Sequence, residues 1–357
     1  MKVYIKFICK IFFKSILFVS LVMLSLVIIL NTLTELEFFS DLKVDTFFPI
    51  YMSLLNSPTL IFEMFPFIFL VSTQLFFINL FNNNEIEIFK YSGLKNSSIL
   101  KIITILSLFL GLIIITLFYT FSSSLKNFYL EIKSKYTTDG KYLAVITNNG
   151  LWIKDIVDGK TSIINASQID KNILLDTFIT EFDPSYNVVR NIKSEKINIK
   201  DNQWLIYNAK VYQDQTSRLE KIVKKNTNFN YERIQSLFSN LSSLSLQNLF
   251  ILRNNYKMLN YSTTEVDVQI QKILSYPIYL TLMTVFSAII MFNTKKTKSS
   301  SLKIALGLFF SVIIYYTFNF FNVMGNTERL SISISIWSPI LLLTMVNSIM
   351  IYRINEK

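Results

Sequence analysis

The chain has 357 residues, 51% of them hydrophobic, and a formal net charge of +11. It contains no histidine and a single cysteine, Cys9, which excludes a histidine ligand, a histidine general base and an intramolecular disulfide. Its seven glycines include no pair with the spacing of a phosphate-binding loop followed by Lys and Ser/Thr, so a nucleotide site of the common kind is excluded too. These patterns indicate no catalytic residue, no metal site and no cofactor.

Long apolar runs lie toward both ends of the chain, and a polar stretch of ordinary soluble composition lies between them. A helix needs ~20 apolar residues to cross the hydrocarbon core of a bilayer. Six runs are long enough, namely residues 11–30, 58–81, 102–121, 273–292, 304–321 and 334–352. The first is longer than the apolar region of a signal peptide, so we interpret it as a retained anchor. The sequence therefore predicts six transmembrane helices.

The charged residues beside these runs alternate between the two sides of the membrane. Lysines precede the first run and lie between the second and third and between the fourth and fifth, whereas the segment after the first run is mainly acidic. Because short cytoplasmic loops carry an excess of Lys and Arg, both chain ends are expected in the cytoplasm, and residues 31–57 and 122–270 on the other side. The same pattern explains the positive charge without a nucleic-acid partner.

Segment 82–100, between the second and third runs, predicts a short cytoplasmic helix. Asparagines 82–84 are expected to cap it, and Glu85 and Glu87 lie in its first turn, where the helix dipole favours acids. Ser92 and Gly93 are expected to end it. Such a helix is suited to docking a partner and equally suited to lying at the lipid headgroups, and the residues alone leave both interpretations open.

Between the third and fourth runs, short β-branched or alternating segments are separated by polar turns. The expected strands are residues 142–147, 151–156, 161–164, 174–182, 188–199 and 204–212. They predict an antiparallel sandwich or an open barrel. An amphipathic helix is expected over residues 246–259, with Ser245 as its N-cap, either packed on the outer domain or transmitting motion.

The order of these elements and several local patterns resemble the permease subunits of the lipopolysaccharide-export ABC transporter, the LptF/LptG family, and more closely the LptG type. The resemblance covers almost the whole chain. The residues that carry it are Ser57-Pro58, Phe65-Pro66, Glu85 through Gly93, the run Gly150-Leu151-Trp152-Ile153-Lys154-Asp155, Gln271-Lys272-Ile273 with Pro277, and Gly307 after a basic segment.

The resemblance implies a membrane α-helical fold with six transmembrane helices and an inserted extracytoplasmic all-β, jellyroll-like domain. The implied division is residues 1–132 for the first three helices with a coupling segment at 82–100, 133–235 for the β domain, 236–270 for a linker helix, and 271–357 for the last three helices. The chain would lie in the inner membrane, with its termini in the cytoplasm and its β domain in the periplasm.

The resemblance further implies a non-catalytic permease that extracts lipopolysaccharide, or a related glycolipid, and passes it to a periplasmic bridge. The implied partners are a dimer of cytoplasmic ABC ATPase subunits, a second homologous permease and a β-jellyroll bridge protein. The implied ATPase-coupling residues are Glu85, Glu87, Phe89, Ser92 and Gly93. The candidates for the lipid path are Asn31, Thr34, Phe318, Phe321 and Trp152.

One position departs from the family's pattern. LptG-type members carry a basic residue near the outer end of the first span, where this chain has Asn31, followed by the acidic Glu35 and Glu37. Because acids repel phosphate, the substrate is less anionic, divalent cations bridge, or the paired permease supplies the basic residues. The sequence leaves all three open.

Two other classes of function remain as alternatives. One is a membrane-anchored sensor or binding protein, although the short cytoplasmic loops leave no room for an output domain. The other is an ABC mechanotransmission subunit that carries no substrate. A membrane enzyme is the least favoured, since no catalytic grouping stands out. Glu63, a carboxylate near the outer end of the second span, is either functional or an interfacial acid facing water.

Overall fold

The computed structural model describes residues 3–136, 151–157, 159–170, 172–213, 216–231, 234, 240–258, 262–293 and 299–355. The strand expected over residues 142–147 lies outside them. The chain divides into two compact units. Met1–Tyr129 together with Thr264–Lys357 forms one, here named the helical unit, and Leu130–Thr263 forms the other, the sheet unit.

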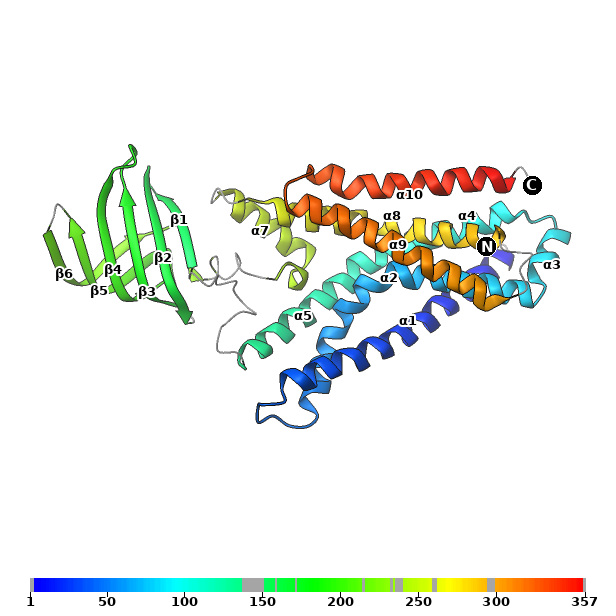
Figure 1. Cartoon of the computed structure of the whole chain (residues 1–357), viewed down its shortest axis with the longest axis horizontal. Coiled ribbons are helices and arrows are strands. Elements are labelled where there is room, and N and C mark those ends of the chain that lie inside the picture. Colours follow the sequence, from blue (N-terminus) through cyan, green and yellow to red (C-terminus); the bar gives the residue numbers. More distant parts are fainter. Residues whose placement is uncertain are drawn as a thin grey trace. The chain divides into compact units, whose positions relative to one another are not determined.

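Long helices and the short helix α3 make up the helical unit (Figure 1). They are α1 (Val3–Phe38), α2 (Phe48–Asn82), α3 (Glu85–Tyr91), α4 (Asn96–Ile113), α5 (Tyr119–Ser134), α8 (Thr264–Asn293), α9 (Ser300–Asn326) and α10 (Ile332–Asn355). A π-helical turn, Ile114–Phe118, joins α4 to α5, so that Asn96–Ser134 is one continuous helix. Six of the described helices are long and apolar enough to cross a bilayer, which confirms the six predicted spans.

Helices α2 and α8 form the centre of the helical unit. In their most apolar stretches 67% and 78% of the residues are buried, against 11% in α9. Hydroxyl groups join the two helices, because Ser287 Oγ donates to the carbonyl oxygen of Leu70 at 2.7 Å and Tyr276 Oη donates to that of Phe62. Neighbouring backbone thus satisfies polar groups that hydrocarbon would leave without partners.

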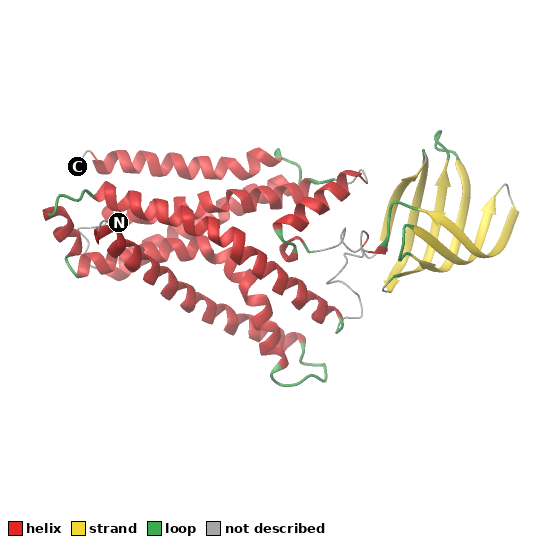
Figure 2. Cartoon of the chain, turned by 180° about the vertical axis from the view of Figure 1, so that it is seen from behind, coloured by secondary structure: helices red, strands yellow, loops and turns green. Residues whose placement is uncertain are grey.

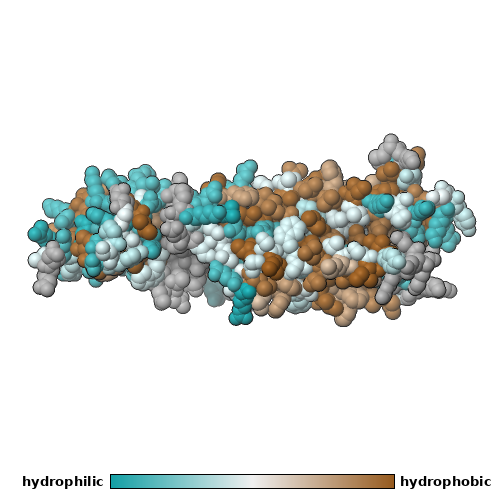
Figure 3. Space-filling view, turned by 90° about the horizontal axis from the view of Figure 1, so that it is seen from above, coloured by the Kyte–Doolittle hydropathy of each residue, from teal (hydrophilic) through white to brown (hydrophobic). Residues whose placement is uncertain are grey.

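The outer surface of the helical unit is largely apolar (Figure 3). Large hydrophobic side chains are exposed on α1, α9 and α10, for example Leu30, Phe309 and Met345. A soluble monomer rarely exposes such an extended apolar surface, whereas lipid chains or another membrane helix cover it without cost. The chain is therefore a multi-pass membrane protein.

The sheet unit is built on one sheet of strands (Figure 2). The sheet is antiparallel, and each strand pairs with the next along the chain. The strands are β1 (Leu151–Val157), β2 (Lys160–Asp170), β3 (Ile173–Phe182), β4 (Val188–Asn198), β5 (Gln203–Gln213) and β6 (Thr216–Asn226). The first five confirm five expected strands. The sixth was not predicted, because within β6 only Val223 is buried and the sequence lacks the alternation of a half-buried strand.

The sheet curls so strongly that the end of β6 reaches the first three strands. Lys225 Nζ donates to Ser162 Oγ at 2.8 Å on β2 and to Glu181 Oε1 at 2.6 Å on β3. Just after β6, Asn228 Nδ2 donates to Asp155 Oδ1 on β1 at 2.9 Å. Of the predicted alternatives, the described strands form one rolled, open sheet, since β1 and β6 do not pair with each other.

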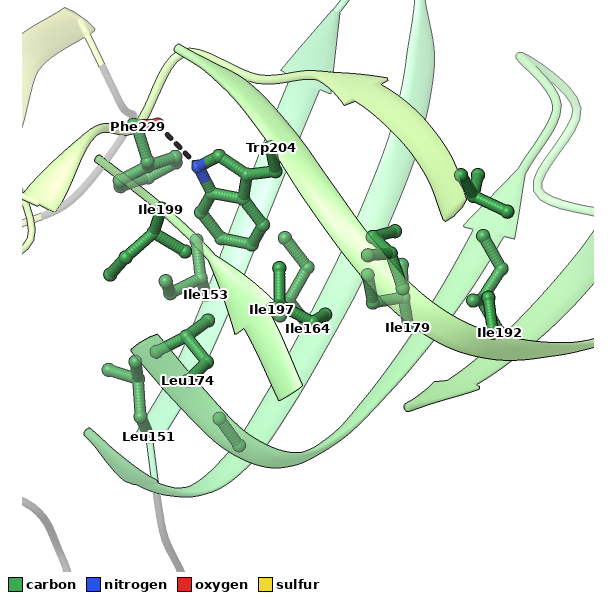
Figure 4. Packing of buried hydrophobic residues seen from close by; sticks show 14 of the residues in the cluster. Leu151, Ile153, Ile164, Leu174, Ile179, Ile192, Ile197, Ile199, Trp204 and Phe229 are labelled. Carbon is green, nitrogen blue, oxygen red and sulfur yellow. Dashed lines mark hydrogen bonds between the residues drawn. The ribbon is translucent and has the colours of Figure 1, made fainter. Parts of the chain in front are cut away.

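Apolar side chains fill the inside of the roll (Figure 4). Trp204 is fully buried there, and its Nε1 donates to the carbonyl oxygen of Phe229 at 2.7 Å. Isoleucines from β1, β2 and β4 lie beside the indole ring, among them Ile153, Ile164 and Ile197. A buried tryptophan needs a partner for its N–H, so the segment after β6 is fixed to the core by this bond. Helix α7 (Leu246–Met258) follows, and the N–H of Asn248 donates to Oγ of the predicted N-cap Ser245 at 3.3 Å.

Two buried carboxylates at the seam of the roll respond to pH in opposite directions. Burial alone would raise the pKa of Glu181, but hydrogen bonds from Arg190 and Lys225 outweigh it and hold that pKa below its ordinary value. Burial raises the pKa of Asp155, and the hydrogen bonds from Asn228 only partly offset it. The Glu181 cluster therefore stabilises the sheet above the ordinary carboxylate pKa, whereas ionised Asp155 opposes folding there.

We predict that Glu181→Gln lowers the stability of the sheet unit by about 2–3 kcal/mol at pH 7, because Lys225 then remains buried without its carboxylate partner. The Glu181 contribution is present above the ordinary pKa of 4.5 and is lost as the pH falls through the lowered native pKa, so the variant should approach wild type in acid. Urea unfolding followed by Trp204 fluorescence, with Trp152 and Trp337 replaced by Phe, measures the effect.

Glu195→Gln, at an exposed position on β4, is the matched control and should change stability little. Equal destabilisation in both variants, or a Glu181→Gln effect that does not shrink in acid, would show that the cluster is not what closes the roll.

Candidate functional site

The short helix α3 runs from Glu85 to Tyr91, as predicted. It ends in a Schellman arrangement, because the N–H of Leu94 donates to the carbonyl oxygen of Phe89 at 2.8 Å and the N–H of Gly93 to that of Lys90 at 2.9 Å. Gly93 has a φ of +78°, a left-handed conformation that a side chain disfavours. The predicted helix end at this glycine is confirmed.

The start of α3 differs from the prediction, since no asparagine side chain caps it. Asn84 adopts a left-handed conformation with a φ of 56°, which asparagine tolerates better than most residues. Its carbonyl oxygen accepts from the N–H groups of Glu87 and Ile88 at 3.1 and 3.2 Å. The Nδ2 of Asn83 instead donates to Asn79 Oδ1 at 3.0 Å. The backbone turn therefore replaces the expected side-chain cap.

One side of α3 faces the other helices of the helical unit. Ile86 is only 2% exposed, and the ring of Phe89 meets the ring of Phe7 on α1 edge-on, with centroids 6.1 Å apart. Glu85 is half-buried, and its Oε2 is buried without a hydrogen-bond partner among the described residues. A buried carboxylate oxygen without a partner is energetically costly, so this position favours an approaching donor or cation.

The other side of α3 is exposed and partly apolar. Tyr91 is 90% exposed and Ile88 is 58% exposed, while Glu87 and Ser92 are also exposed. Thus α3 brings together the predicted coupling residues on one seven-residue helix and its C-cap, with two large hydrophobic side chains beside them.

A second concentration of polar groups joins α1, α2 and α5. Asn31 Nδ2 on α1 donates to the carbonyl oxygen of Ser53 on α2 at 3.3 Å, and Ser53 Oγ donates back to the carbonyl oxygen of Ile28 at 3.0 Å. Asn56 Nδ2 donates to Asn31 Oδ1 at 3.0 Å. These reciprocal bonds fix α1 and α2 to each other at residues that precede α3 in the sequence.

Helix α5 extends this set with charged groups. Lys126 Nζ donates to Asn56 Oδ1 at 2.6 Å and lies 4.7 Å from the centroid of the Tyr129 ring. Tyr129 Oη donates to Glu35 Oε1 on α1 at 2.7 Å, and Glu35 is only 1% exposed. We name the set of Asn31, Ser53, Asn56, Lys126, Tyr129 and Glu35 the three-helix polar network. It places a cation and an anion inside one hydrogen-bonded group.

The three-helix polar network changes the interpretation of the acidic residues near Asn31, which were expected to repel a lipid phosphate. Asn31 and Glu35 point into the protein and are buried, whereas Thr34 and Glu37 are exposed on α1. The Thr34 hydroxyl bonds to the carbonyl oxygen of Leu30 in its own helix. The charge of Glu35 is therefore screened from the exposed surface, and Lys126 brings a positive charge close to Asn31.

The remaining candidates for the lipid path lie elsewhere. Phe318 on α9 stacks on Tyr279 of α8 with ring centroids 4.0 Å apart, and Phe321 is half-buried three residues on. Trp152 is 58% exposed on β1, in the other unit. Glu63 is exposed on α2.

Sequence reasoning missed Asn56, Lys126 and Tyr129 as members of a network. A signal was present, since polar residues at the ends of apolar helices are costly unless they find partners. This signal did not identify the partners of these residues, because the bonds join residues 70 and 94 positions apart in the chain.

We predict that Tyr129→Phe lowers the stability of the helical unit by about 1.5–3 kcal/mol, because the buried Glu35 carboxylate loses a hydrogen bond. Thermal unfolding of the purified chain in detergent measures the change. Thr34→Val is the control on α1, the helix that carries Glu35. Its exposed hydroxyl bonds only within α1, so it should change stability by less than about 0.5 kcal/mol. Equal melting temperatures for Tyr129→Phe and wild type would contradict a stabilising network.

Comparison with curated proteins gave no match. A family model described as lipopolysaccharide export system permease LptF/LptG matches residues 6–353, which is nearly the whole chain, and the match does not separate the LptF from the LptG type. The match takes in both units, with the six spans and the inserted sheet that separates α5 from α8. The chain therefore belongs to the LptF/LptG family of lipopolysaccharide export permeases.

Proposed function

We propose that this chain is one permease subunit of an ABC transporter that takes lipopolysaccharide, or a related glycolipid, out of the inner membrane and passes it to a periplasmic bridge. Family membership supplies the class, a permease for lipopolysaccharide export. The observation that carries the proposal is α3, a short helix with a buried, unpaired Glu85 oxygen beside exposed Ile88 and Tyr91. Such a surface fits docking to a cytoplasmic protein.

The proposed docking partner is a dimer of ABC ATPase subunits. The sequence contains no phosphate-binding loop of the common kind, so the ATP chemistry is assigned to another chain. Glu85 would accept a hydrogen bond from a basic side chain of the ATPase, while Ile88 and Tyr91 would enter an apolar groove. A partly buried pair of this kind fixes orientation and transmits force more than it supplies affinity.

A second, homologous permease is the proposed partner within the membrane. Helices α1 and α9 support this assignment, because only 22% and 11% of their most apolar stretches are buried within the chain. Lipid would enter sideways between α1 of one permease and α9 of the other. Thr34, Phe318 and Phe321 remain the candidates for this path, and Asn31 would act through its contact with Asn56 and the nearby Lys126.

The proposed exit is the sheet unit, with Trp152 on its lipid path, and β6 is the proposed contact with the bridge. Among the described strands β6 pairs with β5 alone, and it exposes Leu219 by 74% and Ile222 by 55%. An edge strand offers main-chain donors and acceptors to an added strand. A β-jellyroll bridge protein would continue the sheet there.

We predict that Glu85→Gln greatly reduces ATP-driven lipid release by the purified complex, by about tenfold, because the approaching basic group loses its charged partner. Release from proteoliposomes and phosphate production, measured on the same sample, give the coupling ratio. Glu87→Gln should have a smaller effect, since Glu87 is already exposed to water. Wild-type release by the Glu85 variant would remove α3 from the proposed ATPase contact.

The proposed orientation places α3 in the cytoplasm and the sheet unit in the periplasm. With Cys9 replaced by Ser, Tyr91→Cys should react with an impermeant maleimide only in inverted membrane vesicles, and Leu219→Cys only in spheroplasts, because each side chain is exposed but on opposite sides. Labelling of both positions from one side would contradict the transport model. A bulky label at Leu219 should also block lipid transfer to the bridge while ATP hydrolysis continues.

A further inference from the structure

The N-terminal turns of α1 carry three lysines on one face. Lys6, Lys10 and Lys14 follow one another at intervals of four residues, and all three are exposed. Residues four apart in a helix lie on the same side, with their Cβ atoms about 5–6 Å apart. We name Lys6, Lys10 and Lys14 the lysine stripe, which extends over about 12 Å of the helix axis.

The opposite face of the same turns holds α1 against the rest of the helical unit. Ile8, Phe12 and Ile16 are buried there. The ring of Phe12 meets the ring of Phe76 on α2 edge-on, with centroids 5.6 Å apart. Packing therefore fixes this part of α1, and the lysine stripe points away from the chain.

The charges of the lysine stripe are not balanced within the described part of the chain, because none of the three lysines forms an ion pair with a described residue. Like charges four residues apart in a helix repel each other, so the stripe contains two unfavourable pairs. Lys14 also lies one turn inside the apolar run 11–30, where its ammonium group must extend to the headgroups or meet an anion. An anion between neighbouring lysines would remove both penalties.

Beyond Lys14 the same face becomes apolar. Leu17 and Leu21 lie three and seven residues farther on, which is the same side of the helix, and they are 49% and 55% exposed. Phe13, beside them, is 52% exposed. A cationic segment followed by an apolar one along a single exposed line matches a lipid whose phosphate lies at the headgroup level and whose acyl chains follow the helix.

We propose that the lysine stripe binds an anionic phospholipid, with the phosphate between neighbouring lysines and the acyl chains against Leu17 and Leu21. The site lies in the leaflet beside the N-terminal end of α1, which is the cytoplasmic leaflet in the proposed orientation. It is separate from the proposed glycolipid path, because Asn31 is about 26 Å farther along the helix axis than Lys14. Binding at this site does not depend on the proposed transport function.

A second permease with acidic side chains is the competing occupant of this face. It would have to place a carboxylate one turn inside the hydrocarbon region, where an acid is costly, whereas the phosphate of a lipid already lies at the edge of that region. Opposite charge and the apolar continuation of the stripe together favour the lipid.

The full chain, purified in detergent, tests the site when it is titrated with phosphatidylglycerol or with phosphatidylcholine of the same acyl chains. Native mass spectrometry gives the affinity of the tightest bound lipid. The variant Lys6→Gln/Lys10→Gln/Lys14→Gln should weaken phosphatidylglycerol binding by about tenfold or more, and it should leave the binding of phosphatidylcholine, which has no net charge, unchanged. Replacing the same three lysines by arginine keeps the charges and should preserve phosphatidylglycerol binding.

Lys90→Gln/Lys95→Gln/Lys101→Gln is the matched control. It removes three exposed lysines from α3, from α4 and from the turn between them, so the net charge falls by the same amount. Its affinity for phosphatidylglycerol should stay within about twofold of wild type, because scattered exposed charges are screened by salt.

Three outcomes overturn the proposal. The first is an unchanged affinity for phosphatidylglycerol in the variant that lacks the lysine stripe. The second is an equal loss in that variant and in the control, which would show that the lipid responds to net charge alone. The third is normal phosphatidylglycerol binding combined with failure to pair with the second permease, because a protein then covers the stripe.

Discussion

The helical unit depends on one constraint, that a polar group inside a bilayer must find its partner within protein. Ser287, Tyr276 and Asn347 meet it by bonding to carbonyl oxygens of neighbouring helices. Just beyond the expected spans, Lys126 bonds to Asn56 and Glu35 accepts from Tyr129. Each such bond holds two neighbouring helices together, because separating them would leave a buried polar group without a partner.

The same constraint is not fully met everywhere in the helical unit. At α3 a carboxylate oxygen lacks a partner in this chain, and at Gln74 an amide oxygen does, among the residues that the structure describes. At the opposite ends of α1, α2 and α5, the polar network is rich in bonds. Hydrogen bonding is thus dense at one end of these helices and incomplete near the other.

Much of the fold follows from the sequence alone, because span length and strand alternation are local properties. The six spans, α3, α7 with its Ser245 cap and five strands were all predictable in this way. Strand β6 was not, since its residues are almost all exposed and only pairing with β5 makes it a strand. The expected capping of α3 by asparagines 82–84 was wrong because a backbone turn replaces it. The bonds of Lys126 were not predictable because they depend on residues distant in the chain.

The roll of the sheet unit imposes an order on how the protein matures. Its first strand is fastened by Asn228, 73 residues later, and its central indole by Phe229, 25 residues later. Contacts between such distant residues form slowly, because a long loop must close before they stabilise anything. Until residue 229 has been synthesised and delivered, the apolar interior stays open to water and to other strands. The apolar faces of the strands therefore remain uncovered, and prone to aggregation, until the last segment of the sheet unit joins the roll.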